Sequence, residues 1–138
     1  MVRKPKKPES EPKIVTVEEF ASKLELETLV KGCGEIAISS INVSRPGLQL
    51  CGFYKHFASD RVQVIGNAEH EYLRCLKADE RAQKIEDLFK CELPCLIVSR
   101  GLEVPECIVK AAEKYGTPLY LMDEQRVRDN CRMYADAF

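Results

Sequence analysis

The chain has 138 residues, of which 45% are hydrophobic and 31% charged, and its net charge is −1. This length suits one domain with a substantial core, and the balanced charge excludes a strongly basic, nucleic-acid-binding domain. No run approaches the roughly 18 apolar residues of a membrane-spanning helix, and no apolar signal-peptide segment stands near the N-terminus. We therefore expect a cytoplasmic protein that contacts neither membrane nor nucleic acid.

The first 13 residues, MVRKPKKPESEPK, differ in composition from the rest of the chain. Five basic and two acidic residues give this segment a charge of about +3, which leaves about −4 for the remainder. Three prolines and only two apolar residues cannot bury enough surface to offset the entropy of ordering. Residues 1–13 are predicted to form a disordered basic tail, and a solvated tail is favoured over a nucleic-acid or membrane arm.

Local patterns in the first half predict one helix and three strands before a second helix. In chain order these are a helix at 16–24, strands at 26–31, 36–43 and 61–66, and a helix from Asn67 to about Leu76. Thr16 and Glu19 have the spacing of a capping box, and Asn67 can cap the second helix. Gly32-Cys33-Gly34 marks a turn between the first two strands.

The second half reads as a helix, a buried strand, and a further helix and strand. The helix at 78–90 has a predicted buried stripe of Ala82, Ile85, Leu88 and Phe89. "LPCLIVS" is continuously apolar and predicts a strand covered on both faces. Pro105 and Gly116 bound another helix ahead of a strand at 119–122, which completes a β-α-β unit. Residues 14–122 are therefore predicted to form a three-layer α/β domain with a mixed sheet of about five strands.

The last segment, 123–138, is predicted to be an amphipathic C-terminal helix. Its apolar stripe recurs at helical spacing and consists of Val127, Cys131, Tyr134 and Phe138. A helix of about 15 residues is marginal in water, so its order depends on packing against the domain or another copy of the chain. We predict self-association through this stripe, and the alternative is a frayed terminal helix.

Motifs for catalysis and metal binding are missing from the sequence. It contains no Gly-x-x-x-x-Gly-Lys-Ser/Thr loop, no Gly-x-Gly-x-x-Gly and no Gly-x-Ser-x-Gly. Its seven cysteines include no Cys-x-x-Cys, and it has only two histidines. Neither Cys51 nor Cys107 has a neighbouring histidine that would nominate it as a nucleophile. We predict no catalytic residue, no metal site and reduced, mostly buried thiols.

A pattern that does stand out is repeated at two predicted strand ends, "INVSRPG" and "LIVSRG". In each, an apolar strand runs into serine and arginine and then reaches glycine. Open α/β sheets bind ligands beyond the carboxyl ends of their strands, and arginine forks bind anions. The predicted ligand site consists of Ser44, Arg45, Gly47, Ser99, Arg100 and Gly101. The alternative is turn chemistry with arginines paired to acidic helices.

These segments resemble the amino-terminal domain of the HPr kinase/phosphorylase family over roughly residues 14–122. The resemblance rests on "VSRPGLQLCGFYKHFASDRVQVIGNAEHEYL" and "PCLIVSRGLEVPECIVKAAEKYGTPL". The motifs, in the family's order, are Ser44-Arg45-Pro46-Gly47-Leu48, Gly52-Phe53-Tyr54, Arg61-Val62-Gln63 with Gly66, and Ser99-Arg100-Gly101-Leu102-Glu103. The resemblance implies a fold similar to the UDP-binding first domain of Mur ligases.

The resemblance also implies a bacterial enzyme that phosphorylates and dephosphorylates a serine of the phosphocarrier protein HPr in carbon catabolite repression. In that family a carboxyl-terminal domain holds the P-loop, ATP, magnesium and the HPr contacts, and the whole protein is a hexamer. We therefore expect a regulatory and assembly module without its own cofactor, whose partner is another copy or the kinase domain. Alternatives are a stand-alone sensor of a phosphorylated metabolite or nucleotide, bound by Arg45 and Arg100, and a pure protein-interaction module.

Overall fold

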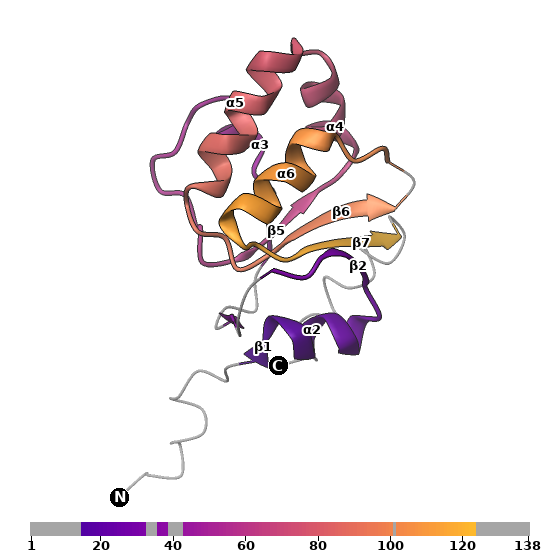
Figure 1. Ribbon diagram of the computed structural model, residues 1–138. Coiled ribbons are helices and arrows are strands. Elements are labelled where there is room, and N and C mark those ends of the chain that lie inside the picture. The colour runs from indigo at the N-terminus through magenta and orange to yellow at the C-terminus, as the bar shows by residue number, and fades with distance from the viewer. Residues whose placement is uncertain (1–14, 33–35, 39–42, 101, 124–138) are drawn as a thin grey trace, which may run out of the picture.

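The computed structural model describes residues 15–32, 36–38, 43–100 and 102–123, which form three layers (Figure 1). A five-stranded sheet is the central layer. Helix α2 (Val17–Leu24) covers one face of the sheet. The other face is covered by α3 (Gly47–Leu50), α4 (Asn67–Arg74), α5 (Ala78–Phe89) and α6 (Glu106–Tyr115). The predicted three-layer α/β fold is confirmed.

The central sheet has the strand order β2-β7-β6-β5-β4. Its strands are β2 (Glu27–Val30), β4 (Val43–Ser44), β5 (Val62–Ile65), β6 (Leu96–Arg100) and β7 (Leu119–Asp123). Strands β4 to β7 are parallel to one another, and β2 runs antiparallel to β7. The mixed sheet of five strands is thus as predicted, and its one antiparallel strand lies at an edge.

Local capping explains where α2 begins. The Thr16 hydroxyl accepts a hydrogen bond from the Glu19 N–H at 3.1 Å, and the Glu19 carboxylate accepts one from the Thr16 N–H at 3.0 Å. The predicted capping box is therefore confirmed. A small antiparallel sheet of β1 (Val15–Thr16) and β3 (Ala37–Ile38) lies next to this helix start. The apolar side of α2 packs on the sheet through Val17, Phe20, Ala21 and Leu24.

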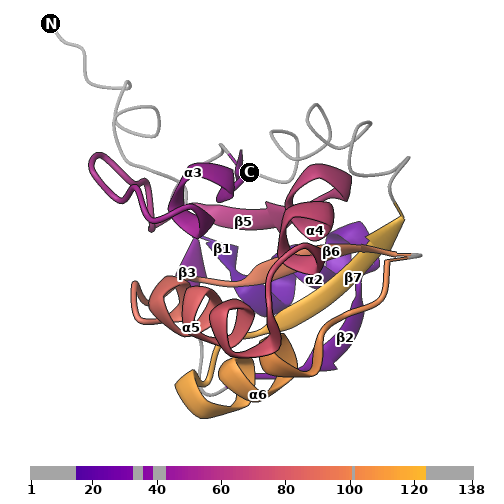
Figure 2. The same cartoon turned by 90° about the horizontal axis from the view of Figure 1, so that it is seen from above.

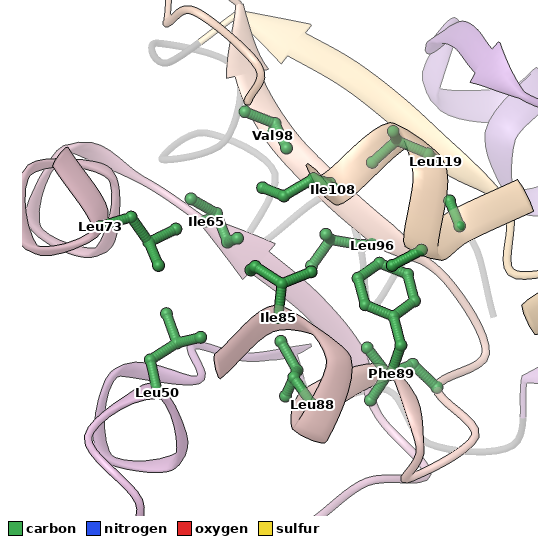
Figure 3. Close-up of a cluster of buried hydrophobic side chains, with 13 residues drawn as sticks. Leu50, Ile65, Leu73, Ile85, Leu88, Phe89, Leu96, Val98, Ile108 and Leu119 are labelled. Atoms are coloured by element: carbon green, nitrogen blue, oxygen red, sulfur yellow. The ribbon is translucent and has the colours of Figure 1, made fainter. Parts of the chain in front are cut away.

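A larger apolar cluster fills the space between the sheet and the four helices on its other face (Figure 3). Its labelled members are Leu50, Ile65, Leu73, Ile85, Leu88, Phe89, Leu96, Val98, Ile108 and Leu119. Helices α5 and α6 lie side by side over the sheet (Figure 2), and Lys114 Nζ of α6 contacts Glu86 Oε2 of α5 at 2.7 Å. This cluster fixes the helices relative to the strand ends.

Three local predictions were wrong. The described part of the segment 36–43 forms two short strands in different sheets, because β3 pairs with β1 and β4 pairs with β5. Asn67 is the first residue of α4, and Gly66 is its N-cap. Ala82 is exposed because the buried stripe of α5 begins only at Ile85, in the half of the helix that packs on the apolar cluster.

Several predictions fall outside the described residues. The tail at 1–13 does so, as does the C-terminal segment 123–138 except for Asp123, which ends β7. The predicted interface stripe belongs to the same region and consists of Val127, Cys131, Tyr134 and Phe138. These stay predictions. None of the helices in the described ranges is long and apolar enough to cross a membrane.

Candidate functional site

The predicted site residues stand at the carboxyl edge of the sheet. Because β4, β5 and β6 are parallel neighbours, their carboxyl ends meet at the same edge. Ser44 ends β4, Arg100 ends β6, and Gly66 follows β5 between them. The two Ser-Arg segments therefore flank the β5–α4 junction, about two strand spacings or ~10 Å apart. Gly101 and the side chain of Arg100 lie outside the described part.

The strand order at this edge is sequential, with β4, β5, β6 and β7 as successive neighbours. All the helices that connect them, α3 to α6, pack on one face of the sheet. Ligand crevices in open α/β sheets form where the strand order reverses and the connections change face. The order from β4 to β7 contains no such reversal, so a site here has to be built by side chains.

The two Ser-Arg segments present different residues to a given face. Val43 packs against the cluster under α2, so Ser44 lies on the other face because side chains alternate along a strand. Arg45 follows the end of β4, and its guanidinium lies where a β-carbon of Gly66 would point, which is the side of Val64 and the α2 cluster. On β6, Ile97 belongs to the same cluster, which places Ser99 on the α2 face. Arg45 and Ser99 are thus the residues that the fold brings to one face, although the sequence pattern pairs each with its own neighbour.

The Glu69 carboxylate organises the β5–α4 junction. Its Oε1 accepts a hydrogen bond from the Gly66 N–H at 2.8 Å and lies 3.4 Å from Arg45 Nη1. The Glu69 side chain is 9% exposed and the Arg45 side chain 49%. An acid in the first turn of a helix suits the positive end of the helix dipole. For Arg45 the structure therefore shows the pairing with an acidic helix, and ligand binding at this residue stays a prediction.

Gly66 makes room for the Arg45 guanidinium. A β-carbon at Gly66 would stand 2.3 Å from Arg45 Nη1 and 3.2 Å from its Cζ. A β-carbon at Gly47 would meet Glu69 Oε2 at 3.7 Å, which is an ordinary contact. The close approach thus occurs at Gly66, which the sequence analysis placed at a strand end and in a family motif but not in the ligand site. Sequence reasoning missed Gly66 and Glu69 as site residues, and the signal that could have found them was the Gly-x-x-Glu spacing of a helix cap and its third residue.

Helix α4 also contacts the loop between β6 and α6. His70 Nε2 lies 2.6 Å from the Glu103 carbonyl oxygen, so this nitrogen carries the proton and donates. In the same loop, the Leu102 N–H donates to the Ser99 carbonyl at 3.2 Å. An open cavity of about 570 Å³ beside α4 is lined by Asn67, Ala68, His70, Glu71, Arg74, Leu102 and Glu103. Its lining mixes acidic and basic side chains and selects no single charge of ligand.

The prediction of mostly buried thiols was wrong for the described residues, because Cys51 and Cys75 are exposed, Cys91 and Cys107 are half-buried, and Cys95 alone of these five is buried. Burial raises the pKa of the Cys107 thiol despite the nearby Arg81 guanidinium, so the sulfur is held as a thiol. Burial also raises the pKa of Cys95, which is fully enclosed beneath α2. Neither sulfur is an activated nucleophile. Across the described ranges, no three His, Cys, Asp or Glu side chains gather in a way that could hold a metal ion.

Fold and edge geometry define the class as a three-layer α/β domain with a polar corner at the carboxyl ends of its parallel strands. Residues 15–129 match the family model described as HPr Serine kinase N terminus. The chain belongs to this family, which confirms the resemblance found in the sequence. A solved structure of the CBS and DRTGG domains of a Clostridium perfringens pyrophosphatase regulatory region, complexed with diadenosine tetraphosphate, has a similar fold. Its TM-score is 0.59 at 14% identity, covering 89% of this chain and 47% of that one.

Curated relatives carry the name HPr kinase/phosphorylase. The protein from Alkaliphilus metalliredigens is 41% identical over 104 residues, which is 75% of this chain and 34% of the relative. The protein from Peptoclostridium acidaminophilum is 43% identical over 108 residues, or 78% and 35% of the two chains. The protein from Clostridium acetobutylicum is 36% identical over 114 residues, or 83% and 38%. The chain thus spans about a third of the length of the curated relatives it matches.

Proposed function

We propose that the chain is the regulatory and assembly module of a bacterial HPr serine kinase/phosphorylase and does not itself transfer phosphoryl groups. The supporting observation is coverage, because relatives with that name match most of this chain, yet the match spans only 32% to 38% of their length. Phosphoryl transfer requires a phosphate cradle and metal ligands. The remaining two-thirds of a relative has room for both.

In this proposal ATP, magnesium and HPr are bound by the catalytic portion of the protein. The partner of the chain is that catalytic portion or another copy of the chain, and its contact with HPr is indirect. A cytoplasmic location and a role in carbon catabolite regulation through the phosphotransferase system follow from HPr being the substrate. The sequence supports this assignment of roles, since it has no Gly-x-x-x-x-Gly-Lys-Ser/Thr loop.

A kinase assay with the purified chain tests the absence of catalysis. The chain, HPr and Mg-ATP are incubated together, and serine phosphorylation is measured by intact-protein mass spectrometry. The intact Alkaliphilus metalliredigens relative is the positive control. We expect no added phosphate with the chain alone. Phosphorylation of HPr that follows the chain through two different chromatographic separations would overturn the proposal.

A chimera tests the assembly role. The matching first third of the Alkaliphilus metalliredigens relative is replaced by this chain, and the oligomeric state and kinase activity are compared with those of the parent. We expect the chimera to keep both. A soluble chimera that phosphorylates HPr but has lost the parent's oligomeric state would contradict the assembly role. If a truncated protein without the inserted chain keeps both the oligomeric state and the kinase activity, the inserted chain has neither an assembly role nor a regulatory one.

A further inference from the structure

A buried hydroxyl without a partner marks the carboxyl edge of the sheet. Ser99 in β6 is 1% exposed, and its Oγ has no hydrogen-bond partner within the described ranges. A serine hydroxyl can donate one hydrogen bond and accept two, and a buried one is almost always bonded to protein, water or a ligand. Two other side-chain atoms share this condition, and Ser99 is the one of the three that stands at the end of a parallel strand.

The strand register places Ser99 beside Gly66. Ile65 of β5 pairs with Val98 of β6, so the next positions along the two strands are Gly66 and Ser99. Gly66 is still extended, with φ −106° and ψ −161°. The space left by its missing side chain holds the Arg45 guanidinium, whose Nη1 would be 2.3 Å from a β-carbon there. The hydroxyl and the guanidinium therefore flank Gly66 on the α2 face.

Within the described residues, the Arg45 guanidinium has N–H groups beyond the one that contacts Glu69. It carries five N–H groups, and Glu69 Oε1 engages Nη1 alone, at 3.4 Å, without the bidentate geometry of a strong pair. The side chain is 49% exposed, so solvent and solutes reach it. The Arg45 guanidinium lies against Gly66 at the end of β5, the middle strand, so it is about one strand spacing, ~4.8 Å, to the side of Ser99. One oxyanion between them can reach both groups with hydrogen bonds of about 2.8 Å.

We propose that Arg45 and Ser99 form, across Gly66, a binding site for the phosphate group of a small molecule. The guanidinium donates charge-assisted hydrogen bonds from Nη2 and Nε, and the Ser99 hydroxyl donates to another oxygen of the same group. In the unliganded chain the Glu69 carboxylate holds the guanidinium and competes with the ligand for it. This site goes beyond the proposed kinase module and does not require it, because phosphate binding is measured without HPr or ATP.

The test is a titration of the full chain with inorganic phosphate at constant ionic strength, followed by calorimetry and thermal unfolding. We expect saturable stabilisation by phosphate and none by matched chloride. Arg45→Gln should weaken binding about tenfold or more, as expected for loss of charge-assisted bonds. Arg45→Lys keeps the positive charge but not the planar guanidinium, so its affinity for phosphate should lie between those of the wild type and Arg45→Gln. Arg74→Gln is the matched control, because that side chain is 65% exposed and pairs with Glu71, and it should leave binding unchanged.

Two further variants separate this site from general electrostatics. Glu69→Gln should tighten phosphate binding by removing the competitor, whereas Glu71→Gln, the same charge change at a side chain 66% exposed, should not. Ser99→Ala should weaken binding several-fold while the melting temperature without phosphate stays equal or rises, because an unpaired buried hydroxyl is removed.

Three results would overturn the proposal. The first is no saturable phosphate stabilisation of the wild type. The second is equal weakening by Arg45→Gln and Arg74→Gln, which would show a response to net charge. The third is unchanged affinity in Ser99→Ala with a lowered melting temperature, which would show that the hydroxyl serves the fold through a bound water.

Discussion

Glu69→Ala tests which of two contacts holds the β5–α4 junction together. The Glu69 carboxylate accepts the Gly66 N–H at 2.8 Å in a buried hydrogen bond and contacts Arg45 Nη1 at 3.4 Å. A hydrogen bond to a charged group contributes about 1.5 to 3 kcal/mol, and its loss leaves the Gly66 N–H buried without an acceptor. We therefore expect Glu69→Ala to lower the free energy of unfolding by about 2 kcal/mol.

Arg45→Ala should cost much less. Its side chain is 49% exposed and its contact with Glu69 is long, and exposed ion pairs contribute about 0 to 1 kcal/mol. Glu69→Gln keeps a carbonyl oxygen that can accept from Gly66 and loses only the charge. It should therefore resemble Arg45→Ala, at under about 1 kcal/mol.

Urea unfolding at neutral pH, followed by far-ultraviolet circular dichroism, measures these differences. Comparison requires equal denaturant slopes, since a changed slope indicates a changed denatured or native state. Glu71→Ala is the control on the same helix, because its side chain is 66% exposed and it should cost almost nothing. If Arg45→Ala destabilises the chain as much as Glu69→Ala, the ion pair carries the junction and the reasoning from burial is wrong.

Two other predictions concern titration and thiol reactivity. Hydrogen bonds from Lys114 and Tyr115 lower the pKa of Glu86 below its ordinary value of 4.5. The ionised carboxylate therefore stabilises the fold above pH 4.5, and this contribution is lost as the pH falls through the lowered pKa. Glu86→Gln should flatten the acid side of a plot of melting temperature against pH, and an unchanged acid side would refute the linkage. Cys51 is exposed, whereas Cys95 is fully buried and its thiol has a raised pKa. An alkylating reagent should therefore label Cys51 in the native chain and Cys95 only after denaturation. Peptide mass spectrometry of the labelled chain measures this difference, and labelling of native Cys95 would contradict it.

The elements that the sequence predicted correctly depend on local signals. The Thr16–Glu19 capping box closes within one helical turn, and Gly116 ends α6 with a φ of 67°, which favours glycine. The unbroken apolar run of β6 was recognisable as a strand covered on both faces. Each of these features is determined by residues a few positions apart, so no knowledge of tertiary pairing was needed.

The candidate site was predicted at the right edge of the sheet but not with the right neighbours. Because the two strand ends share the sequence Ser-Arg, each serine was expected to act with the arginine that follows it. In the fold the Arg45 guanidinium instead lies on the same face as Ser99 of another strand. Which residues share a face depends on the phase of each strand relative to the core, and one position of slip reverses it. The role of Gly66 was hidden for the same reason, because Arg45 reaches it from another strand.

The first turn of α4 connects both sides of the candidate site. Glu69 holds Gly66 and Arg45, and the next residue, His70, donates to the Glu103 carbonyl. The loop that contains Glu103 returns to the site, since the Leu102 N–H donates to the carbonyl of Ser99. A ligand alters a conformational equilibrium only by its differential affinity for the two states. The proposed phosphate would have such a difference if it takes Arg45 from Glu69, and α4 is the element that contacts both this site and the β6–α6 loop.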